Sequence, residues 1–224
     1  MIYLTLFISV LIGFGFGLIL NPKTKLLRLF LSFSGAYLLS ITVLHLLPEV
    51  FETQKKHIGL FILVGILLQT GLEFFSKGAE HGHVHSHDFA IKIPWLIFIS
   101  LSLHAFLEGI PLGFSSNQEL LWAIVIHKIP VTIVLVVFLQ KSSLPKTLVY
   151  MFILFFALMS PLGSLLGNKV GVLIEYETQI NAVIIGIFLH ISTAILFESS
   201  ENHQFNFKKF IAIILGFLVA FISL

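Results

Sequence analysis

The chain has 224 residues, of which 57% are hydrophobic and only 11% are charged. Soluble domains carry about 25% charged residues, so this composition excludes a water-soluble globule and requires lipid around the chain. The formal net charge of +2 contains no dense basic run and gives no support for nucleic-acid binding. The absence of cysteine excludes disulfides, thiolate metal ligands and cysteine nucleophiles.

Hydropathy along the chain predicts an all-α membrane protein with eight transmembrane helices. A spanning helix needs about 20 predominantly apolar residues, so eight of them leave only short loops and no soluble domain. We place them at about 2–20, 29–50, 58–76, 94–113, 120–139, 147–168, 179–197 and 208–223, within one transmembrane domain over residues 1–224. No basic residue precedes Lys23, so we expect the first helix to stay rather than be cleaved as a signal peptide.

The basic residues divide unevenly between the two sides of the membrane. Loops after the odd-numbered helices, with the adjoining helix ends, hold nine of the 13 Lys and Arg residues, three lie on the other side, and Lys128 lies inside a helix. By the positive-inside rule, the richer side is cytoplasmic and both termini are extracytoplasmic. The sequence thus predicts a multi-pass protein with a cytoplasmic loop at 77–92. Short loops and the lack of a eukaryotic sorting signal favour a bacterial inner membrane.

Ionisable residues lie at membrane depth in the hairpin of the fourth and fifth helices. His104 and Glu108 are four residues apart and share one helix face. If the hairpin turns near Ser116, His104 lies twelve residues before the turn and His127 eleven after it. Both imidazoles then reach the midplane, roughly 17 Å below the loop. Two imidazoles and a carboxylate suit Zn²⁺, and Fe²⁺ or Mn²⁺ nearly as well, whereas a single histidine there can also be a helix-to-helix hydrogen-bonding group.

Motifs along nearly the whole chain resemble the ZIP (Zrt/Irt-like) family of divalent-metal permeases. They are Leu44-His45-Leu46-Leu47-Pro48-Glu49, His104-Ala105-Phe106-Leu107-Glu108-Gly109, His127-Lys128-Ile129-Pro130, Pro161-Leu162-Gly163 to Gly167, and Gly186-Ile187-Phe188-Leu189-His190 ending in Glu198. The resemblance implies uptake of Zn²⁺ or a related cation towards the cytoplasm, as substrate and not as cofactor. It also implies two inverted three-helix repeats around a central hairpin (3+2+3) and movement of one helix bundle against another. The oligomeric state stays open, with a homodimer among the alternatives.

The chain departs from the family pattern at three positions of the hairpin. Ala105 stands where the family often has Asn, Lys128 where it has an acid, and Val131 where a further ligand would come. Relatives with the acidic version can hold two metals side by side. We hypothesise that the Lys128 ammonium substitutes for the second cation and leaves one metal on the two histidines and Glu108. The alternative is a lysine that points into a water-filled vestibule and has no chemical role.

Further polar residues have weaker assignments. His45 and Glu49 near the outer end of the second helix, and His190 and Glu198 in the inner half of the seventh, suit an entrance and an exit or are ordinary interfacial residues. Four histidines in the 77–92 loop either bind metal weakly and exchangeably or belong to a solvated linker. These loop histidines are His81, His83, His85 and His87.

Two packing features complete the expectations. Gly13, Gly15 and Gly17 in the first helix predict close approach of another helix. Gln69 and Glu73 in the third helix predict hydrogen bonds between helices.

An intramembrane zinc-dependent hydrolase is the alternative function, because two histidines and a glutamate with an open water position also make a catalytic zinc site. The HExxH spacing is absent, no span contains Asp, and Glu108 as a ligand leaves no obvious general base. We therefore predict a transporter and not an enzyme.

Overall fold

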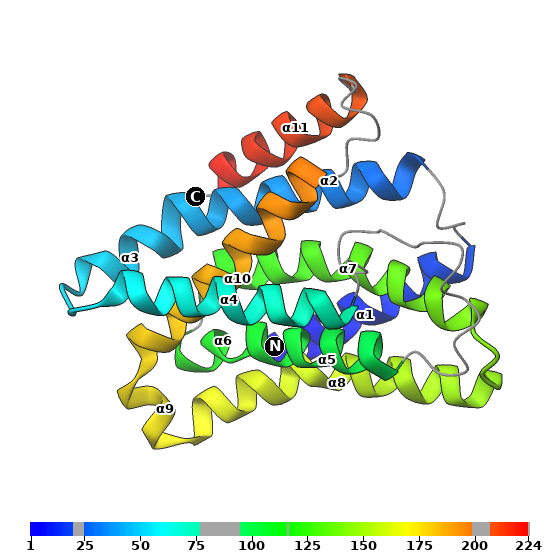
Figure 1. The fold of residues 1–224 in the computed structure, drawn as a ribbon, viewed down its shortest axis with the longest axis horizontal. Coiled ribbons are helices and arrows are strands. Elements are labelled where there is room, and N and C mark those ends of the chain that lie inside the picture. Colours follow the sequence, from blue (N-terminus) through cyan, green and yellow to red (C-terminus); the bar gives the residue numbers. More distant parts are fainter. Residues whose placement is uncertain (20–24, 77–94, 116, 199–206, 224) are drawn as a thin grey trace.

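The computed structural model describes residues 1–19, 25–76, 95–115, 117–198 and 207–223, and every regular element within them is a helix (Figure 1). The elements are α1 (Ile2–Ile19), α2 (Lys25–Ile41), the π-helical turn η1 (Thr42–Leu46), α3 (Leu47–Glu52), α4 (Ile58–Ser76), α5 (Trp95–Gly109), α6 (Pro111–Phe114), α7 (Gln118–Lys141), α8 (Lys146–Lys169), α9 (Gly171–Glu175), α10 (Glu177–Glu198) and α11 (Phe207–Ser223). For the described residues this confirms the predicted all-α class.

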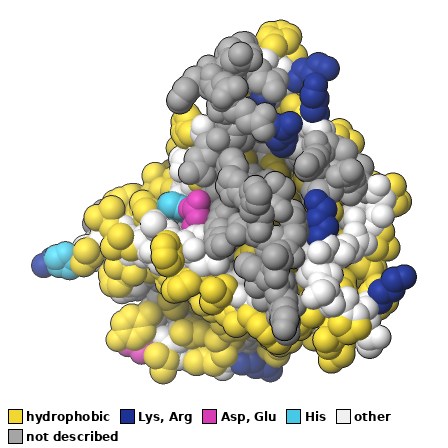
Figure 2. Space-filling model, turned by 45° about the vertical axis from the view of Figure 1, so that its right-hand side comes forward, with side chains coloured by type: hydrophobic (Ala, Val, Ile, Leu, Met, Phe, Trp, Pro, Cys, Tyr) yellow, Lys and Arg dark blue, Asp and Glu magenta, His cyan; other side chains and the backbone are white. Residues whose placement is uncertain are grey.

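Seven helical segments in the described part are long and apolar enough to cross a membrane. They are α1, α2 continued through η1 and α3, α4, α5 continued through α6, α7, α8 and α10. Hydrophobic side chains cover much of the face that Figure 2 shows. The chain is therefore an integral multi-pass membrane protein. The last helix, α11, has 17 residues, which is at the lower end of the length that a span requires.

Prolines break two of these segments at the same end of the molecule (Figure 1). Pro48 follows η1, the π-helical turn that contains His45, and Pro111 begins α6 after α5 has ended at Gly109. Proline has no N–H to donate to the preceding turn, so the regular hydrogen-bond ladder is interrupted there. We call this end, which also holds the α6–α7 turn, the hairpin end.

The helices pack in two groups. In the first group α1 packs on α7 and α8, and α8 packs on α5 and α6. In the second group α10 packs on α2 and α4, and α11 packs on α2. Contacts of α2 with α7, α4 with α5 and α10 with α6 join the two groups.

Glycines bring the helices of the first group together. A Cβ atom on Gly13 would lie 2.7 Å from the carbonyl oxygen of Ile129, and one on Gly17 would lie 2.7 Å from Val136 Cβ, so α1 meets α7 as predicted. The prediction was wrong for Gly15, where a Cβ atom would have nothing within 4 Å. Gly65 of α4 likewise meets α10 in the second group, since its Cβ atom would lie 1.9 Å from the Val183 carbonyl oxygen.

Candidate metal site

The ionisable side chains of the α5–α7 hairpin lie in one buried cluster. His104 and Glu108 come from α5, and His127 and Lys128 come from α7; each is only 1–2% exposed. His104 Nε2 lies 3.4 Å from Glu108 Oε2. The rings of His104 and His127 meet edge-on, with centroids 6.1 Å apart and planes at 87°.

Glu108 divides its two oxygens between two neighbours. Oε2 faces His104, whereas Oε1 forms an ion pair with Lys128 Nζ. Lys128 also donates a hydrogen bond to Ser160 Oγ, and its Nζ lies 5.4 Å from the centre of the Phe156 ring. A buried ammonium is costly unless it has a counter-charge and hydrogen-bond acceptors, and Glu108 and Ser160 supply both.

Ser160 was absent from the sequence-based site, although it holds the cluster to α8. Its hydroxyl donates to the Ala105 carbonyl oxygen at 2.5 Å and lies 3.2 Å from Glu108 Oε1. Gly109 allows this approach, because a Cβ atom there would lie 2.2 Å from the Ser160 carbonyl oxygen. The available signal was a serine directly before the Pro161 motif, in a span with few polar residues.

The cluster fits a metal only after a small movement. Among the described residues, no three His, Cys, Asp or Glu side chains are grouped closely enough to hold a metal ion. The 3.4 Å between His104 Nε2 and Glu108 Oε2 matches two ligands of one tetrahedral Zn²⁺, which lie about 3.3 Å apart when each bond is about 2.0 Å. Two zinc-bound imidazoles would have centroids roughly 5 Å apart, so the ring of His127 must move about 1 Å closer.

His45 lies away from this cluster, at the hairpin end. Asn117 Nδ2 donates to His45 Nε2 at 3.1 Å, and Glu119 Oε2 lies 3.9 Å from the same nitrogen. Asn117 Oδ1 meanwhile accepts from the Leu120 backbone N–H at 2.8 Å and caps α7. Glu49 lines a separate small pocket nearby. The two predicted entrance residues therefore both lie at the hairpin end, apart from His104 and His127 of the buried cluster.

A second histidine and carboxylate pair joins α4 to α10. His190 Nε2 donates to Glu73 Oε2 at 2.5 Å, and His190 Nδ1 lies 3.5 Å from Thr70 Oγ1. The two side chains are 19% and 20% exposed. The predicted hydrogen bond of Glu73 between helices is thus confirmed, with His190 as its partner. The side chain of Glu198, the last residue of α10, lies outside the described part, as do His81, His83, His85 and His87.

Comparisons with known proteins give the family. The model of the family described as ZIP Zinc transporter matches residues 76–223. Protein zntD of Dictyostelium discoideum is 29% identical over 63% of this chain and 24% of its own length. Zinc transporter ZIP1 of Danio rerio is 33% identical over 57% of this chain and 44% of its own length, and zinc transporter ZIP1 of Plasmodium falciparum is 24% identical over 84% and 75%. The chain therefore spans less than half the length of the first two.

These comparisons bear on two earlier expectations. The family is one of transporters and not of enzymes, and no comparison supports the hydrolase. The relatives named above are from eukaryotes, so they give no support for the expected bacterial inner membrane. The family model covers about two thirds of the residues of this chain, and the ordered motifs of the chain resemble that family from the second helix to the seventh. This chain therefore belongs to the ZIP zinc transporter family.

Proposed function

We propose that the protein carries a divalent transition-metal cation, most of all Zn²⁺, through the membrane towards the cytoplasm. The observation that carries this proposal is the buried cluster of His104, Glu108 and His127 between apolar helices. Polar groups at such depth are expensive and mark a pathway or a site. Imidazole and carboxylate ligands suit Zn²⁺, and they suit Fe²⁺ and Mn²⁺ nearly as well. The family of the chain supports zinc as the first substrate to test.

The site holds one metal, and Lys128 takes the place of a second. The carboxylate of Glu108 offers Oε2 to the metal beside His104, while Oε1 stays with the ammonium of Lys128. Water completes the metal's shell alongside His127. The ion pair argues against the alternative in which Lys128 has no chemical role, because its charge directly neutralises a ligand. The ammonium lowers metal affinity by repulsion and so speeds release.

The path has an entrance and an exit on either side of this site. His45 and Glu49 at the hairpin end form the entrance. His190, paired with Glu73, belongs to the inner half of the path, and α10 ends at Glu198 on the exit side. The loop histidines at 81–87 capture ions on the cytoplasmic side.

The packing supports the inverted-repeat architecture that the family resemblance implies. The inversion exchanges the first three membrane helices (α1, α2 and α4) with the last three (α8, α10 and α11), and it exchanges α5 with α7. It therefore converts the contact of α1 with α7 into the contact of α8 with α5, and both contacts occur. It likewise turns the contact of α2 with α11 into that of α10 with α4. Small residues at Gly13 and Gly17 of α1 recur at Gly163 and Gly167 of α8, in each case against a hairpin helix. We therefore assign α11 as the eighth span.

Charge supports the orientation. The described basic helix ends that we expect in the cytoplasm are the start of α2, the end of α7 and the starts of α8 and α11, and all lie opposite the hairpin end (Figure 1). With these basic helix ends in the cytoplasm and the hairpin end outside, both termini face out. Transport then consists of movement of the first helix group, which carries the buried site, against the second.

Purified protein in liposomes tests the proposal. We expect external Zn²⁺ to enter vesicles that contain the protein and to stay outside vesicles that contain the variant with His104→Ala and His127→Ala. This variant keeps the Glu108 and Lys128 ion pair, so loss of uptake reports lost ligands and not an unpaired buried charge. Zn²⁺ entry that is equal with and without the two imidazoles would contradict the proposal. Fe²⁺ and Mn²⁺ in the same assay rank the substrates.

A further inference from the structure

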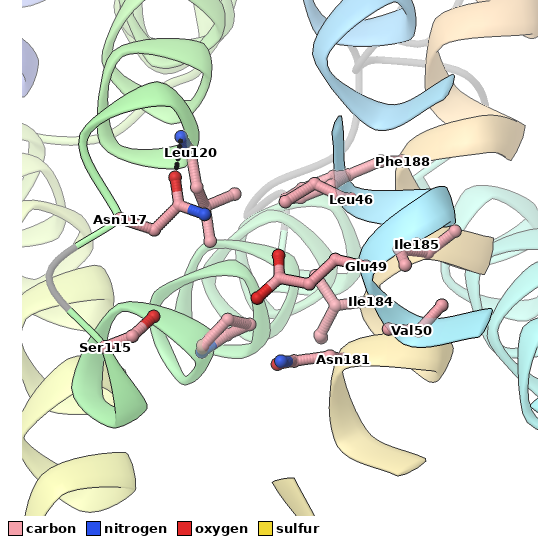
Figure 3. A pocket seen from close by; sticks show the side chains of 11 residues that line it. Leu46, Glu49, Val50, Ser115, Asn117, Leu120, Asn181, Ile184, Ile185 and Phe188 are labelled. Carbon is pink, nitrogen blue, oxygen red and sulfur yellow. Dashed lines mark hydrogen bonds between the residues drawn. The ribbon is translucent and has the colours of Figure 1, made fainter. Parts of the chain in front are cut away.

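A small pocket opens at the hairpin end between the two helix groups (Figure 3). It has a volume of about 20 Å³, which is room for one water molecule or one metal ion. Glu49 of α3 and Asn181 of α10 line it from the second group, and Pro111, Ser115 and Asn117 line it from the first. In Figure 3 the Glu49 side chain projects from α3 towards the α6–α7 turn, and Asn181 lies beside it.

Two side chains of this pocket, Glu49 and Asn181, offer oxygen acceptors. Asn181 Oδ1 is buried and has no hydrogen-bond partner within the described part of the chain. A buried acceptor without a partner is costly, so a hydrogen-bond donor or a cation is favoured there, and the charge of Glu49 favours the cation. Glu49 brings a full negative charge to the same small space, whereas the amide of Asn117 is already committed to His45 and to the cap of α7.

One wall of the pocket lies close to the buried cluster along the chain. Pro111, which forms part of its wall, is three residues after Glu108, or roughly one helical turn away along the same segment. Glu49 and Ser115 are exposed, so the other side of the pocket is open to the medium. A cation that enters between the two helix groups would meet this pocket one turn before Glu108.

We infer that the pocket is a recruitment site for a divalent cation, with the Glu49 carboxylate and Asn181 Oδ1 as its protein ligands. The role of the pocket in delivering the cation to the buried cluster rests on the proposed function, whereas its ability to bind a cation does not. Carboxylate and amide oxygens are hard ligands that suit Mg²⁺, Ca²⁺ and Mn²⁺ and also bind Zn²⁺. The pocket therefore selects by charge, and the imidazoles of His104 and His127, about two helical turns further in, select by softness.

Two ligand sets in series reduce the cost of dehydration. A hydrated dication that entered the buried cluster in one step would lose most of its water in a region of low dielectric constant, where an uncompensated charge is most costly. In the outer pocket it exchanges one or two waters for oxygens and keeps the others, because Glu49 and Ser115 lie at an open face. Loss of the remaining waters is then left to the step into the cluster.

Binding of Mn²⁺ to the purified protein tests the pocket without any transport. The starting protein carries His104→Ala and His127→Ala, which removes the imidazoles of the central site. Electron paramagnetic resonance of free Mn²⁺ measures its dissociation constant. We expect Glu49→Gln and Asn181→Leu each to raise this constant at least about five-fold, as loss of a ligand worth about 1 kcal/mol requires. Asn181→Asp should lower it, and misfolding cannot produce a gain of affinity.

Gln179→Leu is the matched control. Gln179 lies two residues before Asn181, and its Oε1 is also buried without a hydrogen-bond partner within the described residues, but it does not line the pocket. We expect Mn²⁺ binding to be unchanged in this variant. Equal Mn²⁺ affinity in all variants, or an equal loss in the control, would overturn the inference.

Zinc uptake by the otherwise unaltered protein separates this inference from the proposed function. We expect Glu49→Gln and Asn181→Leu to raise the KM for Zn²⁺ about five-fold or more and to leave the maximal rate within about two-fold. Uptake by the original chain with an unchanged KM in both variants would refute the pocket and keep the transporter. No uptake by any protein, together with lost Mn²⁺ binding in the two variants, would refute the transporter and keep the pocket.

Discussion

The carboxylate of Glu108 joins two partners within the buried cluster. One oxygen faces His104 and the other holds Lys128 together with Ser160. An ammonium that is attached to α7 cannot diffuse away, so its charge acts on every cation that binds Glu108. A metal beside it is held less tightly than on the same ligands alone.

Removing this charge should strengthen metal binding. We expect Lys128→Glu to lower the Zn²⁺ dissociation constant at least about ten-fold, because a repulsive charge within a few ångströms becomes an attractive one. Lys128→Met removes the charge and keeps the length of the side chain. Its Zn²⁺ dissociation constant should lie between those of Lys128→Glu and the unaltered protein. Equilibrium titration of the purified protein with Zn²⁺ measures this order, and equal affinity in all three proteins would contradict the assignment of Lys128 as the second cation.

The ion pair should also appear in the stability of the protein. Glu108→Ala leaves the ammonium of Lys128 buried without its counter-charge, which costs about 3–5 kcal/mol in comparable cases. We expect a lower thermal unfolding temperature for Glu108→Ala in detergent. The double variant Glu108→Ala with Lys128→Met should recover most of this loss. If the double variant is no more stable than the single one, the loss comes from packing and not from the charge.

Close contact between α5 and α8 is the element-scale feature that holds the cluster in place. Gly109 meets the backbone of Ser160, and Gly163 meets the backbone of Phe106. These two approaches allow Ser160 to reach Lys128, Glu108 and the carbonyl of Ala105. The glycines are thus required for the site although none of them touches a cation.

A large side chain at this contact should separate the helices. A Cβ atom on Gly163 would lie 2.0 Å from the Phe106 carbonyl oxygen, so we expect Gly163→Leu to destabilise the protein by about 1–3 kcal/mol and to abolish zinc uptake. Gly15→Leu is the control, because a Cβ atom there would have nothing within 4 Å. Thermal unfolding and uptake check both variants. Equal effects of the two substitutions on unfolding and uptake would show that the close α5–α8 contact is not what holds the cluster in place.

At the scale of the whole molecule, the described helices form two groups with different polar contents. The first group carries His104, Glu108, His127 and Lys128, and the second carries the His190 and Glu73 pair. A direct bond between the groups runs from Ser100 Oγ of α5 to the Leu72 carbonyl oxygen of α4, at 2.5 Å. Movement of one group against the other would have to break this bond.

The absence of cysteine makes this movement testable. We expect a short thiol cross-link between Ser100→Cys and Leu72→Cys to stop zinc uptake, because it joins the groups. A cross-link between Gly35→Cys and Ile195→Cys should leave uptake largely intact, since both positions lie in the second group, where a Cβ atom on Gly35 would lie 3.2 Å from Ile195 Cβ. Uptake that survives the first cross-link would exclude relative movement at this contact.

Deletion of residues 81–87 tests the loop histidines at the same scale. If they capture ions at the cytoplasmic face, the deletion should change uptake or its response to metal load. An insertion of seven glycine and serine residues in their place controls for loop length. Unchanged uptake and an unchanged response would favour the solvated linker.

Much of the fold could be predicted because lipid leaves the backbone few choices. Backbone groups in a bilayer must be satisfied within a helix or a closed barrel, so long apolar runs such as Ile2–Ile19 define helices by themselves. The juxtaposition of His104 and His127 followed from equal distances to one turn. Ser160 did not follow, because its place depends on how closely α8 approaches α5. Asn181 did not follow either, since a polar residue at a helix end has no periodic signal.

The sequence by itself determined the class of the protein, the hairpin and the family, because hydropathy, spacing and ordered motifs are local properties of the chain. Tertiary structure alone decided which oxygen of Glu108 meets Lys128, that Ser160 joins them, that His190 pairs with Glu73, and that Glu49 and Asn181 line one pocket. These contacts join helices that are far apart in sequence. Their geometry depends on glycine contacts and helix breaks in three dimensions, which no spacing along one helix records.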